Sequence, residues 1–288
     1  MKVIFIGGLS TGQVALDYLA CNKYVSIPLI ITKPIDVNGY NLNLEHFETQ
    51  PCEVINDLNA NNSLDKINQL SPDLIFVAGW SGLLSKQLIE KPKKGTIGFH
   101  PSLLPSDRGR SVLAWQIEEG YEETAVSMFY YNEIPDCGDI IAQEKIRIEK
   151  NDYINDVLNK CDNAIYNLMR AYFPLVRKGI APRKPQNINE GNFRRLRDEK
   201  DSLINWDTNG DVIYNKIRAI SRPYPGAYFI YKKKKIKIWE SVFFKDKEHK
   251  GLDKIINVGT IKRLAKKLYL VRCKDGSIQI KTDVELDV

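Results

Sequence analysis

Residues 2–12 read Lys-Val-Ile-Phe-Ile-Gly-Gly-Leu-Ser-Thr-Gly, a short apolar run that leads into a glycine-rich turn, and a helical pattern follows through Ala20. Further buried runs occur at Val25–Ile31 and Asp73–Ala78, and Ser63–Leu70 between them has a helical pattern. Short apolar runs that alternate with helices are typical of a parallel sheet covered on both faces. The sequence therefore predicts an open α/β sheet at the N-terminus.

The glycines of the first turn do not indicate a dinucleotide site. Gly7, Gly8 and Gly12 do not match the spacing G-x-G-x-x-G, and no acidic residue stands at the distance that this motif requires. Glycines that follow a first strand are explained equally well by the sharp turn that the chain makes there.

Two later strands are predicted at Thr124–Tyr131 and Asp139–Ile148. A long amphipathic helix is then predicted from Asn151, as its N-cap, to Gly179, a residue type that commonly ends helices. Residues 180–208 are rich in Pro, Asn, Arg and Asp and have no sustained period, which is typical of a linker.

The C-terminal part becomes β-like after a helical stretch at Asp211–Ser221. Short strands at close spacing predict a small β-barrel. With a length of 288 residues, which favours about two domains, we expect a catalytic domain at 1–179, a linker at 180–208 and a C-terminal domain at 209–288. The predicted C-terminal strands are Gly226–Lys232, Ile236–Phe244, Gly259–Ile261, Leu268–Val271 and Ser277–Lys281.

The composition is that of an ordinary globular protein, with 43% hydrophobic and 27% charged residues, which excludes disorder, collagen and coiled coil. No apolar run approaches the ~18 residues of a membrane-spanning helix, and the N-terminal run is too short for a signal-peptide core. The five cysteines are scattered, without C-x-x-C or zinc-ligand spacing, so we expect a reduced, cytoplasmic protein without a metal site. They are Cys21, Cys52, Cys137, Cys161 and Cys273.

The net charge of +6 averages two opposite parts of the chain. Residues 1–176 carry a net charge of −7, whereas residues 209–288 carry +10. A basic C-terminal domain suits nucleic acid or phosphates, but a lysine-rich surface that is merely solvated has the same composition.

The stretch with the clearest chemistry is 95–110, which reads Gly-Thr-Ile-Gly-Phe-His-Pro-Ser-Leu-Leu-Pro-Ser-Asp-Arg-Gly-Arg. His100 ends an apolar run, which places it at the carboxyl edge of a strand, where open α/β sheets bind ligands. Asp136 lies in a predicted tight turn between two later strands. An imidazole beside a carboxylate is a common proton-transfer unit, although Asp136 could instead only close its own turn.

Together these residues resemble the family of formyltransferases that use 10-formyltetrahydrofolate. That family has Asn-x-His, then S-L-L-P and R-G, and an Asp in D-x-G about 36 residues beyond the His; here His100 and Asp136 are 36 positions apart. The resemblance covers nearly the whole chain and implies a Rossmann-like open-sheet domain followed by a small OB-like barrel. The other matching segments are Ser102–Pro105, Arg108–Gly109, Asp136–Gly138, Ile204–Trp206, Ile217–Ala219 and Pro223–Tyr228.

The resemblance also implies roles. An acceptor amine attacks the formyl carbon of the folate through a tetrahedral oxyanion; His100 takes the amine proton or stabilises the intermediate, and Asp136 holds His100 charged and oriented. The formyl donor is 10-formyltetrahydrofolate and no metal is required. The implied pterin pocket consists of Trp80, Ser81, Gly82, Leu83, Leu84, Ile134 and Asp136.

One position departs from the family. The family's Asn, whose amide donates a hydrogen bond to the oxyanion, is replaced by Gly98. Losing such a donor typically costs ~2.7–4 kcal/mol of transition-state stabilisation, so we expect a backbone N–H at Gly98, Ser102 or a water to replace it. The segment Gly98–Pro101 is similar to a G-x-H-P form found in a branch that acts on amino sugars, and a pseudaminic-acid-type pathway is consistent with this form.

Four functions are compatible with this resemblance: a sugar N-formyltransferase for glycan synthesis, a methionyl-tRNA formyltransferase, a glycinamide ribonucleotide formyltransferase or formyltetrahydrofolate hydrolase, and a binding module that lost catalysis through Gly98. The C-terminal domain disfavours the third. Binding of tRNA needs many basic contacts, yet no Lys or Arg occurs between Lys33 and Lys66, which holds Asp36, Glu48 and Asp57.

A nucleotide-linked amino sugar is therefore the expected acceptor. We expect neither a nucleic acid nor a membrane as a partner. Enzymes of this branch are often dimers, which leaves a homodimer open. Guanidinium groups suit the diphosphate of such an acceptor. The implied substrate residues are Ser10, Thr11, Ser102, Arg108, Gly109, Arg110, Arg194 and Arg197.

Overall fold

The computed structural model describes residues 1–33, 42–47, 53–55, 63–246 and 257–288. They form two compact units. The first comprises Met1–Gly109, Thr124–Ile146 and Leu158–Arg194, and the second comprises Arg110–Glu123, Arg147–Val157 and Arg195–Val288. The units are thus assembled from alternating segments of the chain, and the domain boundaries expected from the sequence stay a prediction.

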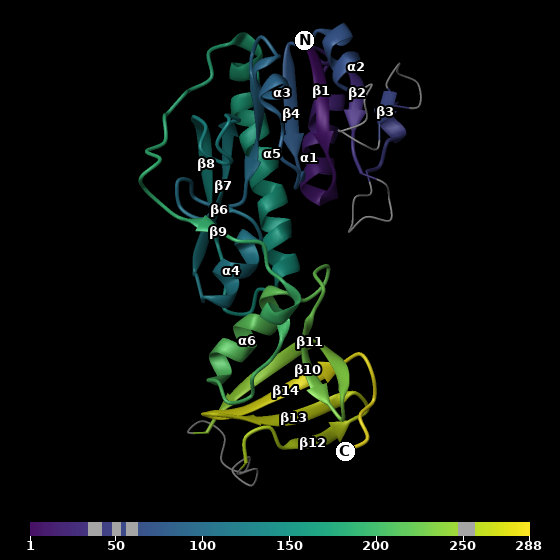
Figure 1. The fold of residues 1–288 in the computed structure, drawn as a ribbon, viewed down its shortest axis with the longest axis vertical. Coiled ribbons are helices and arrows are strands. Elements are labelled where there is room, and N and C mark those ends of the chain that lie inside the picture. Colours follow the sequence, from purple (N-terminus) through teal and green to yellow (C-terminus); the bar gives the residue numbers. More distant parts are fainter. Residues whose placement is uncertain (34–41, 48–52, 56–62, 247–256) are drawn as a thin grey trace. The chain divides into compact units, whose positions relative to one another are not determined.

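The first unit is built on a seven-stranded sheet with the order β3-β2-β1-β4-β5-β7-β8 (Figure 1). Strands β3, β2, β1, β4 and β5 pair in parallel, and β7 pairs antiparallel to β5. The predicted open α/β sheet is confirmed, with an antiparallel addition after β5. The strands are β1 (Lys2–Gly7), β2 (Ser26–Ile31), β3 (Glu53–Ile55), β4 (Leu74–Ala78), β5 (Thr96–His100), β7 (Glu123–Tyr130) and β8 (Ile140–Arg147).

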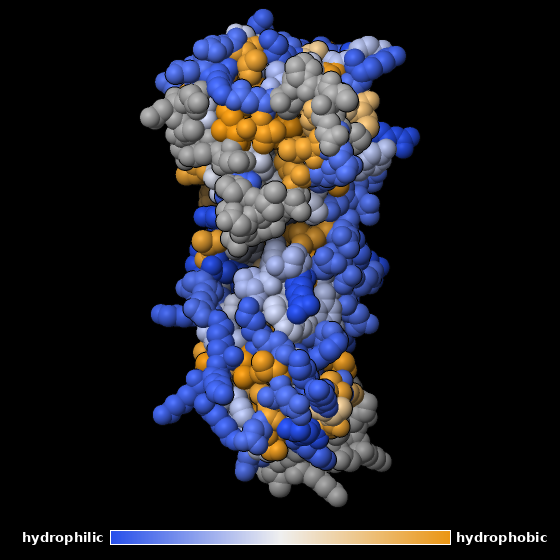
Figure 2. Space-filling view, turned by 90° about the vertical axis from the view of Figure 1, so that its right-hand side faces the viewer, coloured by the Kyte–Doolittle hydropathy of each residue, from blue (hydrophilic) through white to orange (hydrophobic). Residues whose placement is uncertain are grey.

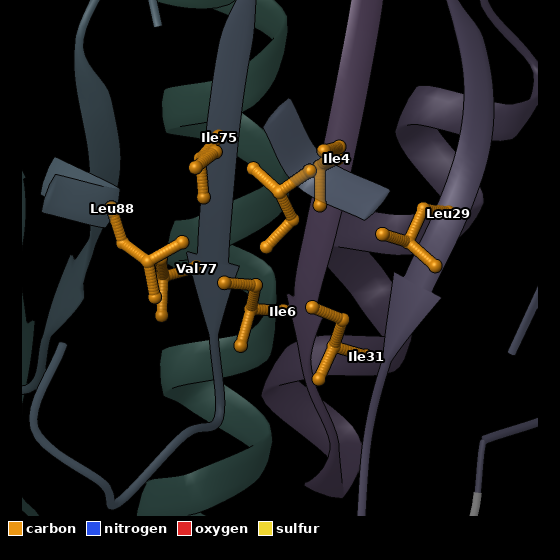
Figure 3. Close-up of a cluster of buried hydrophobic side chains, with 8 residues drawn as sticks. Ile4, Ile6, Leu29, Ile31, Ile75, Val77 and Leu88 are labelled. Carbon is orange, nitrogen blue, oxygen red and sulfur yellow. The ribbon is translucent and has the colours of Figure 1, made fainter. Parts of the chain in front are cut away.

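Helices cover both faces of this sheet. On one face Phe76 of β4 contacts Phe173 of α5 (Ile154–Lys178), which in turn contacts Tyr18 of α1 (Leu9–Ala20). On the other face, isoleucine, leucine and valine side chains of β1, β2 and β4 pack with Ile67 of α2 (Ser63–Leu70) and Leu88 of α3 (Lys86–Glu90) (Figure 3). Both faces are apolar, which explains why these strands are continuous hydrophobic runs in the sequence.

The long helix α5 begins at Ile154, two residues later than an N-cap at Asn151 predicts. Asn151 lies outside it, and the carboxylate of Asp156 in the first helical turn accepts the backbone N–H of Tyr153 at 2.8 Å. Such a bond satisfies an N–H that a helix start otherwise leaves without an acceptor. The predicted end is confirmed, because Gly179 directly follows the helix with φ of 77°.

The second unit contains a five-stranded antiparallel sheet with the order β10-β11-β14-β13-β12 and the helices α4 (Val112–Glu118) and α6 (Gly210–Ala219). The small β domain predicted for the C-terminal part is confirmed, and its strands form an antiparallel sheet. Lys232 and Lys233 have positive φ angles in the turn between β10 and β11, as expected for a hairpin. The strands are β10 (Ala227–Tyr231), β11 (Lys234–Lys245), β12 (Ile261–Ala265), β13 (Leu268–Cys273) and β14 (Gly276–Thr282).

Hydrophilic residues cover much of the face drawn in Figure 2, and hydrophobic residues gather there in separate patches. In the part of the chain that the structure describes, no helix is both long and apolar enough to cross a membrane. The described cysteines are free, and Cys52 lies outside the described residues. Asp36, Glu48 and Asp57 of the acidic stretch lie outside them as well.

Candidate functional site

The loops that follow β1 and β4 adjoin at the carboxyl edge of the sheet. The backbone N–H of Gly8 donates to the carbonyl of Ala78 at 3.1 Å. Gly79 lies against Gly8 and Thr11, since a Cβ on Gly79 would be 2.9 Å from Thr11 Oγ1. The structure therefore brings two predicted site regions together: Ser10 and Thr11 at the start of α1, and the loop that begins at Trp80.

His100 is the last residue of β5 and is only 5% exposed. Its Nε2 lies 2.8 Å from the carbonyl oxygen of Asp107, and its Nδ1 lies 3.5 Å from Oδ1 of Asp136. A carbonyl oxygen can only accept a hydrogen bond, so Nε2 carries the proton and Nδ1 of the neutral ring keeps its lone pair. The basic atom of His100 therefore faces the carboxylate.

Asp136 lies in the predicted tight turn, with φ of 58°. Its Oδ2 accepts the backbone N–H of Gly109 at 2.9 Å, which leaves Oδ1 toward His100. Burial raises the pKa of the neighbouring Cys137 thiol, so this sulfur stays protonated and is a poor nucleophile. The turn thus presents a carboxylate to the imidazole and no competing thiolate.

This arrangement suits proton transfer from an attacking amine. Nδ1 can accept the proton, and the resulting imidazolium lies beside the carboxylate of Asp136 in a mostly buried environment, where opposite charges attract more strongly than in water. The structure brings together the two residues that the sequence predicts as catalytic.

Asp107 fixes the other side of the imidazole, and the sequence did not single it out. It is 2% exposed; its N–H donates to Oδ1 of Asn192 at 2.8 Å, and its carboxylate accepts from Asn192 Nδ2 at 2.9 Å and Arg194 Nε at 2.6 Å. These bonds orient the peptide whose carbonyl holds His100. Arg194, expected to bind substrate phosphate, is instead an ion-pair partner of a buried carboxylate.

A second set of bonds joins the catalytic turn to the segment 186–194, which the sequence assigns to a linker. Nε2 of Gln186 donates to the carbonyl oxygens of Asp136 and Gly138, at 2.9 and 2.7 Å. The guanidinium of Arg108 donates to the carbonyls of Glu190 and Asn187 and to Oε1 of Gln186, at 2.9 to 3.2 Å. We call these residues, 186–194, the brace.

The brace corrects the expected role of Arg108. This side chain is 1% exposed, and its guanidinium points to protein carbonyls, so it supports the site and has no open face for a diphosphate. The short strands β6 (Arg108–Gly109) and β9 (Phe193–Arg194) pair in parallel beside it. A Cβ on Gly109 would lie 2.3 Å from the carbonyl oxygen of Arg194, which explains the glycine after Arg108.

Ser102 and Gly98, the two residues expected to support an oxyanion, already have partners within the protein. Ser102 is fully buried, and its hydroxyl donates to the carbonyl of Ser106 at 2.7 Å, so its only proton is already used. Gly98 lies inside β5, paired with Val77 on one side and Phe129 on the other. Neither expectation fits the structure, because a serine hydroxyl has one proton and a central strand uses its backbone in the sheet.

The residues expected around the pterin divide into buried and exposed ones. Trp80 and Leu84 pack against the apolar cluster of Figure 3, as does Tyr131, which precedes the Asp136 turn. Leu83 is 79% exposed and Ile134 of the Asp136 turn is 43% exposed. Ser81 and Gly82 are exposed as well, and Ser81 accepts a hydrogen bond from Lys33, whose ammonium also lies 5.0 Å from the Trp80 ring centre.

Two of the expected substrate residues belong to the second compact unit. Arg110 is exposed there. The side chain of Arg197 is 8% exposed, pairs with Glu118 at 2.5 Å and lies over the Trp115 ring. Arg197 is thus held by its own unit, which corrects its expected role as a phosphate ligand.

Within the described ranges, no group of three or more His, Cys, Asp or Glu side chains is placed to hold a metal ion. His249 lies outside those ranges. His100 and Asp136 together offer a group that can accept and release a proton.

Comparison with known proteins gives matches over most of the chain. Residues 1–171 match the family model described as formyl transferase, and residues 197–286 match the one described as formyl transferase, C-terminal domain. Among solved structures, the chain is similar to HypX from Aquifex aeolicus in complex with tetrahydrofolic acid, with 18% identity and a TM-score of 0.71 over 97% of this chain and 43% of that one. The chain thus spans less than half of HypX.

Two other solved structures are similar over most of their own length. One is an N-formyltransferase from Helicobacter canadensis in complex with folinic acid and dTDP-3-aminofucose, with 18% identity and a TM-score of 0.72 over 98% of this chain and 99% of that one. The other is a methionyl-tRNA formyltransferase from Clostridium thermocellum, with 20% identity and a TM-score of 0.64 over 84% and 93%. At these identities the likeness concerns the fold.

Proposed function

Because this chain belongs to the formyl transferase family, we propose that it transfers a formyl group from 10-formyltetrahydrofolate to the amino group of a nucleotide-linked deoxyamino sugar, for glycan synthesis. The observation that carries the chemical part is the pair formed by Nδ1 of His100 and the carboxylate of Asp136. It stands at the carboxyl end of β5, where a proton acceptor for an attacking amine is needed.

The residues present suit a folate. Trp80 and Leu84 offer partly buried apolar surface, and Ile134 offers an exposed apolar side chain beside Asp136. A pterin ring needs flat apolar surface with a few polar groups at its edge, and the Asp136 turn can supply these groups. Bound there, the folate supplies the activated formyl group, and the chain's own residues orient it and accept the proton of the amine.

The choice of a sugar acceptor rests on charge and on size. Residues 1–176, which include His100 and Asp136, carry a net charge of −7, and this balance disfavours binding of a polyanionic tRNA stem. The similarity to the Helicobacter canadensis enzyme, which was solved with dTDP-3-aminofucose, extends over nearly the whole of both chains. With Arg108 and Arg194 held by protein groups, Ser10 and Thr11 remain the candidates for the acceptor side in the first unit.

Methionyl-tRNA formyltransferase is the second candidate, because an enzyme of that activity shares the fold and residues 209–288 carry a net charge of +10. A binding module without catalysis is the third. We further place the enzyme in the cytoplasm, as its free cysteines Cys21, Cys137, Cys161 and Cys273 suggest, and leave a homodimer as its expected assembly.

A formyl-transfer assay tests the proposal. UDP-, dTDP- and GDP-linked amino sugars and aminoacylated initiator tRNA are offered side by side with 10-formyltetrahydrofolate, and the products are identified by mass spectrometry. We expect one nucleotide sugar to be N-formylated. Formylation of tRNA alone would replace the sugar by tRNA as the acceptor, and folate binding without turnover of any acceptor would support the binding module.

A further inference from the structure

The space beside Gly98 is occupied by a tyrosine. A Cβ built on Gly98 would lie 2.6 Å from Cε2 and 3.2 Å from the hydroxyl oxygen of Tyr131. The same Cβ would lie 2.5 Å from the carbonyl oxygen of Val77. The absence of a side chain at position 98 therefore allows the phenol to reach the strand that carries His100.

Tyr131 is held firmly in this position. Its ring stacks on Phe129, with 5.1 Å between ring centres and 16° between planes, and its backbone N–H donates to the carbonyl of Thr96 at 2.8 Å. Residues 98 and 100 are two apart in β5 and so project toward the same face of the sheet. Gly98, with the phenol against it, therefore shares a face with the imidazole of His100.

The hydroxyl of Tyr131 is available as a hydrogen-bond donor. Among the residues that the structure describes, it makes no hydrogen bond, although the side chain is largely buried. Burial and, to a lesser extent, the nearby carboxylate of Asp136 raise the pKa of Tyr131 well above its usual value. The phenol therefore keeps its proton at neutral pH and can donate but not act as a base.

Two other donors around His100 are already committed to protein acceptors. The hydroxyl of Ser102 donates its proton to the carbonyl oxygen of Ser106. The terminal N–H groups of the Arg108 guanidinium donate to carbonyls of the brace. A formyl oxygen that gains negative charge needs a donor placed in advance. The Tyr131 phenol is a donor near Asp136, and among the residues that the structure describes it has no protein acceptor.

We propose that Tyr131 is a catalytic residue whose hydroxyl donates a hydrogen bond to the formyl oxygen as the acceptor amine attacks. This proposal rests on the formyl transfer proposed above. The amine nitrogen bonds to the formyl carbon, and the electron pair of the carbonyl moves to its oxygen, which Tyr131 stabilises. The amine proton passes to His100. The electron pair on the oxygen then re-forms the carbonyl as the bond to the folate nitrogen breaks, and protonated His100 returns the proton to that leaving nitrogen.

Replacement of the hydroxyl alone tests this role. Tyr131→Phe keeps the ring and its stacking on Phe129, so the thermal unfolding midpoint should stay as in the wild type. We expect kcat to fall about 100- to 1000-fold, as for loss of a single oxyanion donor, with KM of both substrates little changed. The matched control is Tyr130→Phe, since the neighbouring ring lies on the opposite face against Arg183 and should leave kcat unchanged. A kcat of Tyr131→Phe within twofold of the wild type would overturn the proposal.

A second readout needs no turnover. In isotope-edited infrared spectra of bound 10-formyltetrahydrofolate carrying a ¹³C-formyl group, without acceptor, we expect a lower carbonyl stretch in the wild type than in Tyr131→Phe. Equal frequencies would contradict the hydrogen bond. Both tests are independent of the acceptor. If the wild type formylates tRNA instead of a sugar, the sugar proposal fails. The effect of Tyr131→Phe is then measured with tRNA as the acceptor, and it decides the role of Tyr131 separately.

Discussion

His100 lies between two groups of the protein, with its Nε2 at the carbonyl of Asp107 and its Nδ1 facing the carboxylate of Asp136. The carbonyl determines which nitrogen carries the proton, and the carboxylate favours the charged ring once Nδ1 accepts a second proton. A base that is oriented before the substrate arrives loses little free energy to reorganisation during the reaction.

Gly98 tests how tightly the residues around His100 are packed. Gly98→Ala places a methyl group within 2.6 Å of both the Val77 carbonyl oxygen and the Tyr131 ring, so we expect a loss of about 1–3 kcal/mol in the free energy of unfolding. The larger Gly98→Asn should destabilise at least as much and lower turnover, contrary to a simple restoration of the family's Asn. Urea denaturation checks both variants; wild-type stability of Gly98→Ala would contradict the packing described.

Asp162 of α5 gives a prediction for pH. Burial raises the pKa of its carboxyl above the ordinary 3.8, and a hydrogen bond from Ser10 offsets this only in part. As the pH rises through 3.8 the unfolded chain ionises first, so Asp162 lowers stability at neutral pH and has no effect below that range. Asp162→Asn should raise the unfolding midpoint at pH 7 but not at pH 3, whereas Asp283→Asn on the surface should do neither. An equal gain at both pH values would contradict this origin.

At the scale of elements, the brace joins residues 186–194 to two loops of the catalytic unit. Gln186 contacts the carbonyls of Asp136 and Gly138 and the guanidinium of Arg108. Gln186→Ala removes all three contacts, so we expect a stability loss of about 1–3 kcal/mol and a lower kcat, because the Asp136 turn is less fixed. Asn189→Ala, an exposed side chain in the same segment, is the control. Equal kcat values for the two variants would refute a supporting role for the brace.

The sequence predicts strands and long helices well because apolar runs and helical periods record burial. Ser63–Leu70 is predicted and found with the same bounds, and His100 and Asp136, which the family resemblance pairs, lie close together. The brace could not be predicted from the sequence. Most of its acceptors are backbone carbonyls, which every residue type has, and an irregular polar segment has the composition of a linker. Likewise Arg108, Arg194 and Arg197 appear as phosphate ligands in the sequence, and only burial shows that protein groups hold them.

At the scale of the whole molecule, the N-terminal and C-terminal parts of the chain carry net charges of opposite sign. Residues 1–176, which include His100 and Asp136, carry a net charge of −7, which suits a small acceptor better than a nucleic acid. The basic residues 209–288 belong to the second compact unit, whereas His100 and Asp136 belong to the first. A structural unit rich in lysine is sufficient to explain the overall charge of +6 without a nucleic-acid partner.

The most direct test of the account is the rate of formyl transfer by Asp136→Asn beside Asp139→Asn. The first keeps an oxygen for the Gly109 N–H but removes the charge next to His100, whereas Asp139 pairs with Arg183 at the edge of the same turn. With the amine acceptor that the wild type uses, we predict a kcat at least about 100-fold lower for Asp136→Asn and a wild-type kcat for Asp139→Asn. A wild-type kcat for Asp136→Asn would contradict the assignment of His100 and Asp136 as the catalytic pair.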